Sequence, residues 1–338
     1  MAAVPCAVPH PVAAPGGGPS PAAAAWRRLV ASPVARAGLI IVGAFVLVAI
    51  VTPAVHHYDA RTDADLGQRL QPPTPTHPFG TDTLGRDILV RVLHATRVSL
   101  GLAVGAVGVA ALVGSTLGFL AGHLRRQVDL VVMFCMDILL AFPATLLAIA
   151  IVAMIGPGLG NSLFAISLVS VPVYARLSRG AVLALRDQEF VLAAWGLGGT
   201  SGRVLRSHLV PNSLPPLIVQ TTLSVAFAIL EAAALGFLGL GAQPPTPEWG
   251  AMLADSYKYF TSGAWWVFFF PGAAIMLAVL GFNLLGDGLR DALDPRLSVG
   301  GGLDGPVRDL PQEPVAPARP ALEQRDSAGA LAPGPTQV

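Results

Sequence analysis

Long apolar blocks separated by short polar stretches are the feature that most restricts how this chain can fold. Hydrophobic residues make up 53% of its 338 residues and charged residues only 12%, whereas a soluble globular domain carries about 25% charged residues. Apolar helices of about 20 residues cross a bilayer, because a helix satisfies its own backbone hydrogen bonds where no water is present. The pattern therefore predicts an all-α integral membrane protein with about six transmembrane helices. We place the spans at residues 37–55, 99–122, 128–155, 162–177, 217–240 and 264–285.

The two ends of the chain differ in composition from the part between them. Residues 1–25 and 297–338 are rich in Pro, Ala and Gly, and we interpret both as disordered tails. The first of them also lacks the charged start and apolar centre of a signal peptide. Residues 26–296 are then expected to form one transmembrane domain.

Three local patterns within this domain lead to structural predictions. Pro143 should kink or split the third span. Glycine recurs every fourth residue at Gly114, Gly118 and Gly122, a spacing that lets two helix backbones approach closely in lipid. Residues 83–98 carry apolar residues on one helical side and charged residues on the other, which predicts a separate amphipathic helix at the membrane surface.

The placement of arginine predicts the orientation of the chain. If the N-terminus is inside and the chain crosses six times, basic residues outside the C-terminal tail are about twice as frequent on the inner side. We therefore expect a multi-pass protein of the cytoplasmic (inner) membrane with both termini in the cytoplasm. The polar stretch 186–216 is expected on the same side.

This stretch, RDQEFVLAAWGLGGTSGRVLRSHLVPNSLPP, is too polar to cross a membrane. Asp187 is a candidate N-cap for a short helix, and Gly196, Gly198 and Gly199 allow a left-handed C-terminal cap that turns the chain into a second short helix. Ala193 and Ala194 are small, so another surface could approach the backbone closely. We interpret the stretch as a cytoplasmic coupling loop that passes force to the spans, and the alternative is an ordinary helical hairpin between two spans.

Two carboxylates fall inside predicted spans, Asp137 in the third and Glu231 in the fifth. Exposing either to lipid would cost several kcal/mol, so each should face other helices or a water-filled path. One interpretation is that they line or gate a translocation path. The alternative is that each is a structural carboxylate bound to a neighbouring helix.

Several activities are not supported by the residues present. A P-loop ends in Gly-Lys-Ser/Thr, but Tyr257 precedes the single lysine, Lys258, so any ATP is hydrolysed by another chain. No catalytic constellation or metal-ligand motif is found, and the chain is expected to bind no cofactor. Cys6 and Cys135 are not expected to pair, and a net charge of +1 gives no sign of nucleic-acid binding.

The 186–216 loop resembles a loop of the inner-membrane permeases of binding-protein-dependent ABC importers. That family's pattern is Glu-Ala-Ala, three residues, Gly, nine residues and Ile-x-Leu-Pro, and Ala193, Ala194, Gly198 and Pro211 match it. The resemblance implies that these residues dock an ATPase subunit.

The loop also departs from the family pattern. Leu192 stands where the family has its acidic residue, and His208 and Val210 replace the Ile and Leu. Leu192 removes a charge from the docking surface, and Glu189, one helical turn earlier, could partly substitute for it.

Three further stretches, 77–100, 235–256 and 270–296, resemble the dipeptide/oligopeptide/nickel branch of this family, and the likeness covers roughly residues 30–298. It implies a type I permease fold with a coupling helix in membrane lipid. It also implies a homologous second permease subunit, ABC ATPase subunits and an extracytoplasmic substrate-binding protein as partners.

The function expected from these residues is that of the transmembrane permease subunit of an ATP-driven importer of di- and oligopeptides. Import of nickel or another small solute by the same machine is an alternative. An ion-gradient-driven secondary transporter, which would show inverted repeats with broken helices, and a structural membrane partner without a pore are others.

Overall fold

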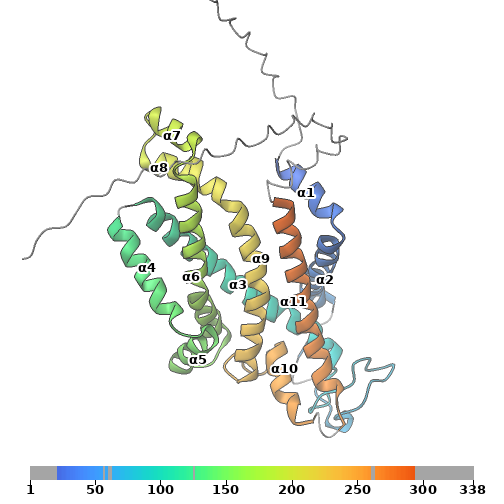
Figure 1. Cartoon of the computed structure of the whole chain (residues 1–338). Helices are drawn as coiled ribbons and strands as arrows, with labels where there is room; N and C mark the ends of the chain where they lie inside the picture. Colours follow the sequence, from blue (N-terminus) through green and yellow to red (C-terminus); the bar gives the residue numbers. More distant parts are fainter. Residues whose placement is uncertain (1–20, 56–57, 60–62, 125, 260–262, 294–338) are drawn as a thin grey trace, which may run out of the picture. The chain divides into compact units, whose positions relative to one another are not determined.

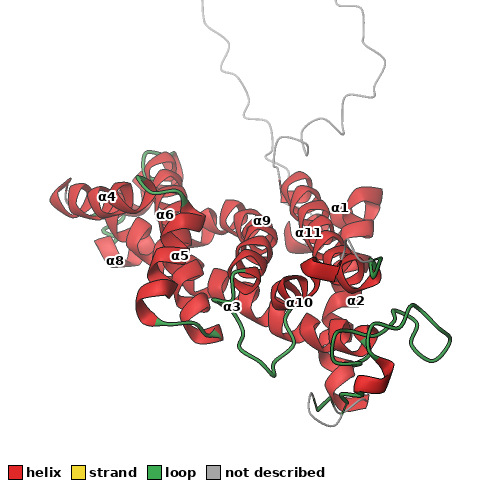
Figure 2. Ribbon diagram, turned by 90° about the horizontal axis from the view of Figure 1, so that it is seen from below, coloured by secondary structure: helices red, strands yellow, loops and turns green. Residues whose placement is uncertain are grey.

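The computed structural model describes residues 21–55, 58–59, 63–124, 126–259 and 263–293. Over these ranges the regular structure is helical apart from one isolated bridge between Thr81 and Asp87 (Figure 2). Five helices are long and apolar enough to cross a membrane, or six if one bent pair counts as a single span. The prediction of an all-α membrane protein with about six spans is confirmed.

The α-helices are α1 (Pro21–Ala31), α2 (Pro33–Val55), α3 (Ile88–His123), α4 (Arg126–Leu140), α5 (Ala144–Ile155), α6 (Leu159–Leu185), α7 (Glu189–Gly196), α8 (Ser201–Val204), α9 (Val210–Phe237), α10 (Trp249–Ser256) and α11 (Trp266–Leu293). Short 3-10 turns lie at Leu66–Gln68 and Tyr257–Tyr259, and a π-helical turn at Leu205–Leu209 precedes α9. Figure 1 shows α7 and α8 at one end of α6 and α9, and α10 at the other. We call these two ends the hairpin end and the α10 end.

The bent pair is α4 and α5, which meet at 88°. The N–H of Ala141 makes the last backbone hydrogen bonds of α4. Pro143 is then the N-cap residue of α5 and has a non-helical backbone conformation. Because proline has no N–H and clashes with a preceding turn, a straight helix cannot continue through this position. The prediction that Pro143 kinks or splits the third span is confirmed.

Helix α3 is one helix of 36 residues, so the separate amphipathic helix expected at 83–98 is wrong. Asp82 accepts hydrogen bonds from the backbone N–H groups of Leu84 and Arg86 and holds residues 81–87 in a loop. Asp87 then caps α3 by accepting from the N–H of Val90. The expected charged side is not exposed either, because Arg86 and Arg91 are buried.

Other element boundaries also differ from those expected. Helix α6 extends to Leu185 instead of residue 177, because Arg179 pairs with Asp129 of α4 and its charge does not end the helix. Helix α1 begins at Pro21, inside the tail predicted for residues 1–25, because its alanine run favours a helix. Residues 1–20 and 294–338 lie outside the described residues, so the tails remain predictions.

The glycine repeat of α3 packs against α6. A Cβ atom added at Gly118 would lie 2.2 Å from the carbonyl oxygen of Ala175 and 2.1 Å from Ser178 Oγ, and one at Gly114 would lie 2.5 Å from the carbonyl oxygen of Val171. Only a residue without a Cβ allows this approach, and the predicted close packing is confirmed.

We expect Gly118→Ala to destabilise the folded protein by about 1–3 kcal/mol, because the new methyl group overlaps a backbone carbonyl that cannot move alone. Gly108→Ala is the matched control in the same helix, since a Cβ there meets no atom within 4 Å. Thermal unfolding of the detergent-purified variants measures both effects. Equal stability of the two variants would contradict the packing argument.

At the α10 end, Glu248 is fully buried and caps α10. Its carboxylate accepts from the N–H groups of Gly250 and Ala251, at 2.8 and 2.9 Å, and from Ser99 Oγ of α3 at 3.2 Å. The neighbouring Trp249 is also buried, and its indole N–H donates to the carbonyl oxygen of Val92. These contacts fix α10 to α3.

Burial raises the pKa of Glu248 above its ordinary value of 4.5, although the three hydrogen bonds act in the opposite direction. Folding therefore favours the protonated form of Glu248. The resulting contribution to the free energy of unfolding is fully present below the unfolded-state pKa and is lost as pH rises through the folded-state pKa. We expect the stability of the wild type relative to Glu248→Gln to fall as pH is raised from 4.5 toward neutrality. Unfolding of both proteins across this pH range tests the prediction. A difference in stability between them that does not change with pH would refute it.

Candidate functional site

The chain leaves α6 at Leu185 and returns to the bundle in α9, forming a hairpin of α7, a tight turn, α8 and the π-helical turn. We call residues 186–209 the hairpin. Figure 1 shows α7 and α8 together at the end of the long helices. The short helix, glycine turn and second short helix expected from the sequence are all present.

A glycine cap makes the sharp turn of the hairpin. Gly198 has φ +81°, its N–H donates to the carbonyl oxygen of Trp195, and the N–H of Gly199 donates to that of Ala194, both at 3.0 Å. These two bonds form a Schellman motif, which needs a left-handed residue at this position. The left-handed cap predicted from the glycines is confirmed at Gly198.

The N-terminus of α7 differs from the prediction. Gln188, not Asp187, is the N-cap residue, and its side chain makes no capping hydrogen bond. Arg186 still has helical backbone angles at the end of α6, and Gln188 has the extended conformation of an N-cap residue. Asp187 instead lies 3.4 Å from Arg186.

A small apolar cluster fastens the hairpin to the bundle. Val191 of α7, Val204 of α8 and Leu209 of the π-helical turn are buried together against Val182 of α6, and Phe119 of α3 packs on the same cluster. The hairpin is therefore attached to two long helices as well as to the chain at its ends. A displacement of the hairpin would therefore be transmitted directly to α3 and α6.

The other large apolar side chains of α7 and of its C-cap residue Leu197 are exposed. Leu192 is 55% exposed and Leu197 is 91% exposed, and Phe190 and Trp195 are also exposed. Val191 is the buried residue of α7, so the larger apolar side chains of this helix lie on its exposed side. A cluster of exposed large apolar side chains on a capped hairpin is typical of a surface that another protein covers.

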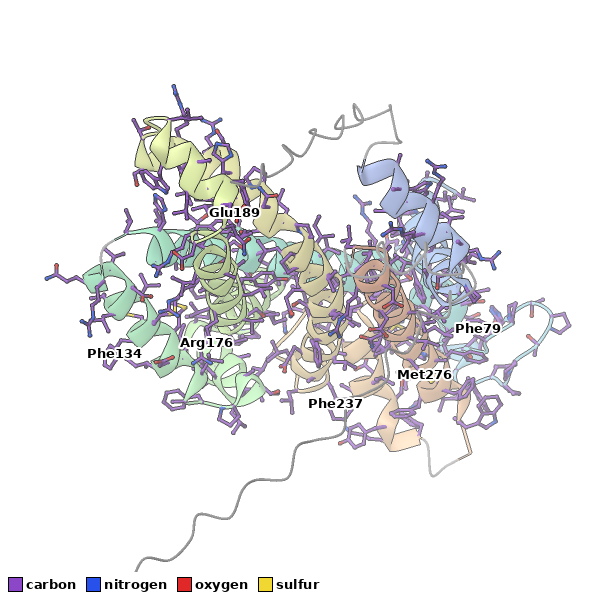
Figure 3. The ribbon with its side chains drawn as sticks, turned by 45° about the horizontal axis from the view of Figure 1, so that its top comes forward. Phe79, Phe134, Arg176, Glu189, Phe237 and Met276 are labelled. Atoms are coloured by element: carbon purple, nitrogen blue, oxygen red, sulfur yellow. The ribbon has the colours of Figure 1, made fainter. Side chains whose placement is uncertain are left out.

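The residues predicted for ATPase docking are exposed to different degrees. Glu189, Leu192, Ala193, Gly198 and Pro211 are exposed, and Ala194 is half-buried. Figure 3 shows Glu189 at the hairpin. Over the described parts of the chain, Glu189 makes no ion pair.

His123, at the end of α3, makes contacts with the hairpin that were not predicted from the sequence. Its Nε2 lies 2.6 Å from Ser201 Oγ of α8, and its ring lies nearly parallel to that of Trp195, with centroids 6.4 Å apart. A lone histidine at a helix end has no pattern that could point to this role. Together with Phe119, it joins α3 to both arms of the hairpin.

The two carboxylates predicted inside the spans have separate partners. Asp137 of α4 accepts from Arg176 of α6 at 2.6 Å. Glu231 of α9 accepts from Thr145 of α5 through Oε1 at 2.7 Å, while its buried Oε2 has no hydrogen-bond partner in the described part of the chain. The structure therefore does not bring Asp137 and Glu231 into one hydrogen-bonded group.

Two family models match the chain. Residues 114–299 match the model of the binding-protein-dependent transport system inner membrane component, and residues 20–73 match the N-terminal transmembrane domain of oligopeptide transport permease C. The first match covers the hairpin and most of the spans.

Curated relatives are similar over most of their length. The chain is 50% identical to the dipeptide transport system permease protein DppC of Alkalihalophilus pseudofirmus, over 82% of this chain and 91% of the relative. It is 45% identical to the di/tripeptide transport system permease protein DppC of Pseudomonas aeruginosa, over 82% and 93%. It is 42% identical to the glutathione transport system permease protein GsiD of Pectobacterium atrosepticum, over 80% and 90%.

A solved structure shares the fold. A chain of the MetNI methionine ABC transporter in inward-facing conformations superposes with a TM-score of 0.50 at 18% identity, covering 60% of this chain and 96% of that one. At this identity the likeness concerns the fold alone.

Proposed function

Because the chain belongs to the family of binding-protein-dependent transport system inner membrane components, we propose that it is a transmembrane permease subunit of an ATP-driven importer that moves di- and oligopeptides across the cytoplasmic membrane. The peptide permeases among its relatives support this substrate class. Import of nickel or another small solute has less support, since two of the three relatives compared above are named as dipeptide or di/tripeptide permeases and the third as a glutathione permease. A secondary transporter or a structural membrane protein does not fit the family.

The single observation that carries the mechanism is the capped hairpin with its outward apolar surface. We place the hairpin end in the cytoplasm, together with both termini, as arginine placement predicts. Separate ABC ATPase subunits then dock at Glu189, Leu192, Ala193, Ala194, Gly198 and Pro211. The chain itself has no P-loop and binds no cofactor in this proposal, so the ATPase subunits use the ATP.

The hairpin transmits the motion of the ATPase subunits in this mechanism. When ATP brings the two subunits together, the docked hairpins move with them, and rigid attachment is what turns that motion into a change of the spans. The buried cluster around Val191 and the contact of His123 with Ser201 supply attachments to α6 and α3. Leu192 replaces a charge by an apolar contact at the docking surface.

The other partners belong to the same proposal. A homologous second permease subunit completes the pore, and an extracytoplasmic substrate-binding protein delivers peptide to the α10 end. We assign Asp137 and Glu231 to the lining or gate of the path, because the Asp137 side chain is 60% exposed and Glu231 Oε2 has no hydrogen-bond partner in the described part of the chain.

Reconstitution into proteoliposomes tests the proposed function. We expect this chain alone to show neither peptide uptake nor ATP hydrolysis. Adding the second permease, the ATPase subunits and the binding protein should restore both activities. Autonomous uptake driven by an ion gradient would overturn the proposal.

A further inference from the structure

Two ion pairs join α4 to α6 on a side of the bundle that faces away from the other helices. Figures 1 and 2 both place α4 at the edge of the bundle beside α6, and Figure 3 shows Phe134 and Arg176 there. At 1.5 Å per residue, Arg176 lies about 25 Å from the start of α6 and about 14 Å from its end. Helix α6 is long and apolar enough to cross the membrane, and α4 meets this criterion together with α5 as the bent pair.

The two pairs differ in geometry. Arg179 holds Asp129 with two nitrogens on two oxygens, and the side chains are only 33% and 23% exposed. Arg176 holds Asp137 through one nitrogen and one oxygen at 2.6 Å, and the side chains are 53% and 60% exposed. The first pair has the bidentate form of a fixed clamp, while the second leaves donors and an acceptor free for another group.

A hollow of about 550 Å³ lies over these pairs. Leu130, Met133 and Phe134 of α4 form its apolar part, and the four charged side chains form the rest. A charge pair this exposed cannot face lipid without a large cost, so in the assembled protein it faces water, a polar ligand or the second permease subunit. Binding pockets of this size combine apolar walls with a few charged groups in the same way.

We propose that the Asp137–Arg176 pair is a transient binding site for the charged ends of a dipeptide zwitterion on its way through the permease. The peptide carboxylate takes Arg176, and its ammonium group takes Asp137, while Phe134 and Met133 contact the side chains. This inference rests on the proposed function as a peptide importer. The Asp129–Arg179 pair stays closed and keeps α4 on α6.

Exchange of partners explains why a pair suits this task better than a single charge. The empty site has no net charge, because Asp137 and Arg176 neutralise each other. A zwitterion that opens the pair replaces one ion pair by two, and its departure restores the original one, so neither state leaves a charge without a partner at membrane depth. A site that binds only moderately also allows release, which transport requires.

The test uses the complete transporter in proteoliposomes with Ala-Ala, its C-terminal amide and its N-acetyl derivative, each at a concentration that saturates the binding protein. We expect the wild type to move Ala-Ala at least about tenfold faster than either blocked form, since each lost contact is a charged hydrogen bond. Arg176→Gln should abolish the discrimination against the amide alone, and Asp137→Asn the discrimination against the acetyl form alone. Arg126→Gln is the control, because Arg126 is exposed on the same helix as Asp137 and does not line the hollow, and it should leave both ratios unchanged.

Other outcomes would overturn the inference. If Asp137→Asn and Arg176→Gln slow all three peptides equally, and the charge-reversed double variant Asp137→Arg/Arg176→Asp restores uptake, the pair is only a clamp or a contact with the second permease. Unchanged ratios in both single variants also refute the site. Failure of the proposed function would be recognised separately, because the wild-type complex would then move no peptide.

Discussion

Replacing Gly198 with valine is expected to lower peptide uptake by the assembled transporter at least about tenfold while leaving membrane insertion intact. A β-branched residue at φ +81° is strained by about 1–3 kcal/mol, and relief of that strain breaks the two hydrogen bonds that close the turn. The turn sets the direction of α7 relative to α8, so the docking surface would lose its shape. Uptake, ATP hydrolysis and the amount of ATPase subunit that co-purifies are the measurements.

Gly202→Val is the matched control, since it adds the same side chain to the same hairpin. A Cβ atom at either position meets no atom within 4 Å, but only Gly198 of the two has a positive φ. We expect Gly202→Val to retain most uptake. Normal uptake by Gly198→Val, or equal loss in both variants, would show that the left-handed turn is not what couples the hairpin to the ATPase.

The second large effect is expected at the α10 end, where Asp82→Ala should destabilise the protein by about 3–5 kcal/mol. Asp82 is 4% exposed and binds Arg86 Nε at 2.7 Å and Arg91 Nη1 at 2.5 Å, and both arginines are buried. Removing the carboxylate leaves two buried guanidinium groups beside each other without their main counter-charge. Thermal or denaturant unfolding of the purified protein measures the loss.

Asp255→Ala provides the comparison for this prediction. Asp255 lies 3.9 Å from Arg91 but is 57% exposed, so its removal should change stability by less than about 1 kcal/mol. If Asp82→Ala were no more damaging than Asp255→Ala, the cluster of Asp82, Arg86 and Arg91 would not be a structural core of the loop before α3.

The parts of the fold that depend on local chemistry could be predicted from the sequence. Pro143 breaks a span because its ring forbids the helical bond, and Gly198 ends α7 because few other residues adopt its φ. The spacing of Gly114, Gly118 and Gly122 predicted a close helix contact, although not that α6 is the partner. Each of these depends on one residue type at one place.

Most of the failures depended on how the chain folds back on itself. The sequence placed Arg86 and Arg91 on a polar face, because a helical pattern does not show that the loop before α3 brings Asp82 onto both guanidinium groups. The roles of Arg176 and Arg179 were also not foreseen, since their carboxylate partners lie on α4. His123 meets Ser201 only after the hairpin folds back on α3.

Helix α3 is longer than the hydrocarbon layer is thick. It has 36 residues, about 54 Å at 1.5 Å per residue, whereas the hydrocarbon layer is about 30 Å thick. Figure 1 shows it running obliquely behind α6, α9 and α11. Near one end, Val92 accepts a hydrogen bond from Trp249 of α10, and the other end is tied to Ser201 through His123. In the proposed orientation, a single unbroken helix thus reaches both aqueous compartments. Peptide delivery on one side of the membrane and ATP hydrolysis on the other therefore act on the same helix.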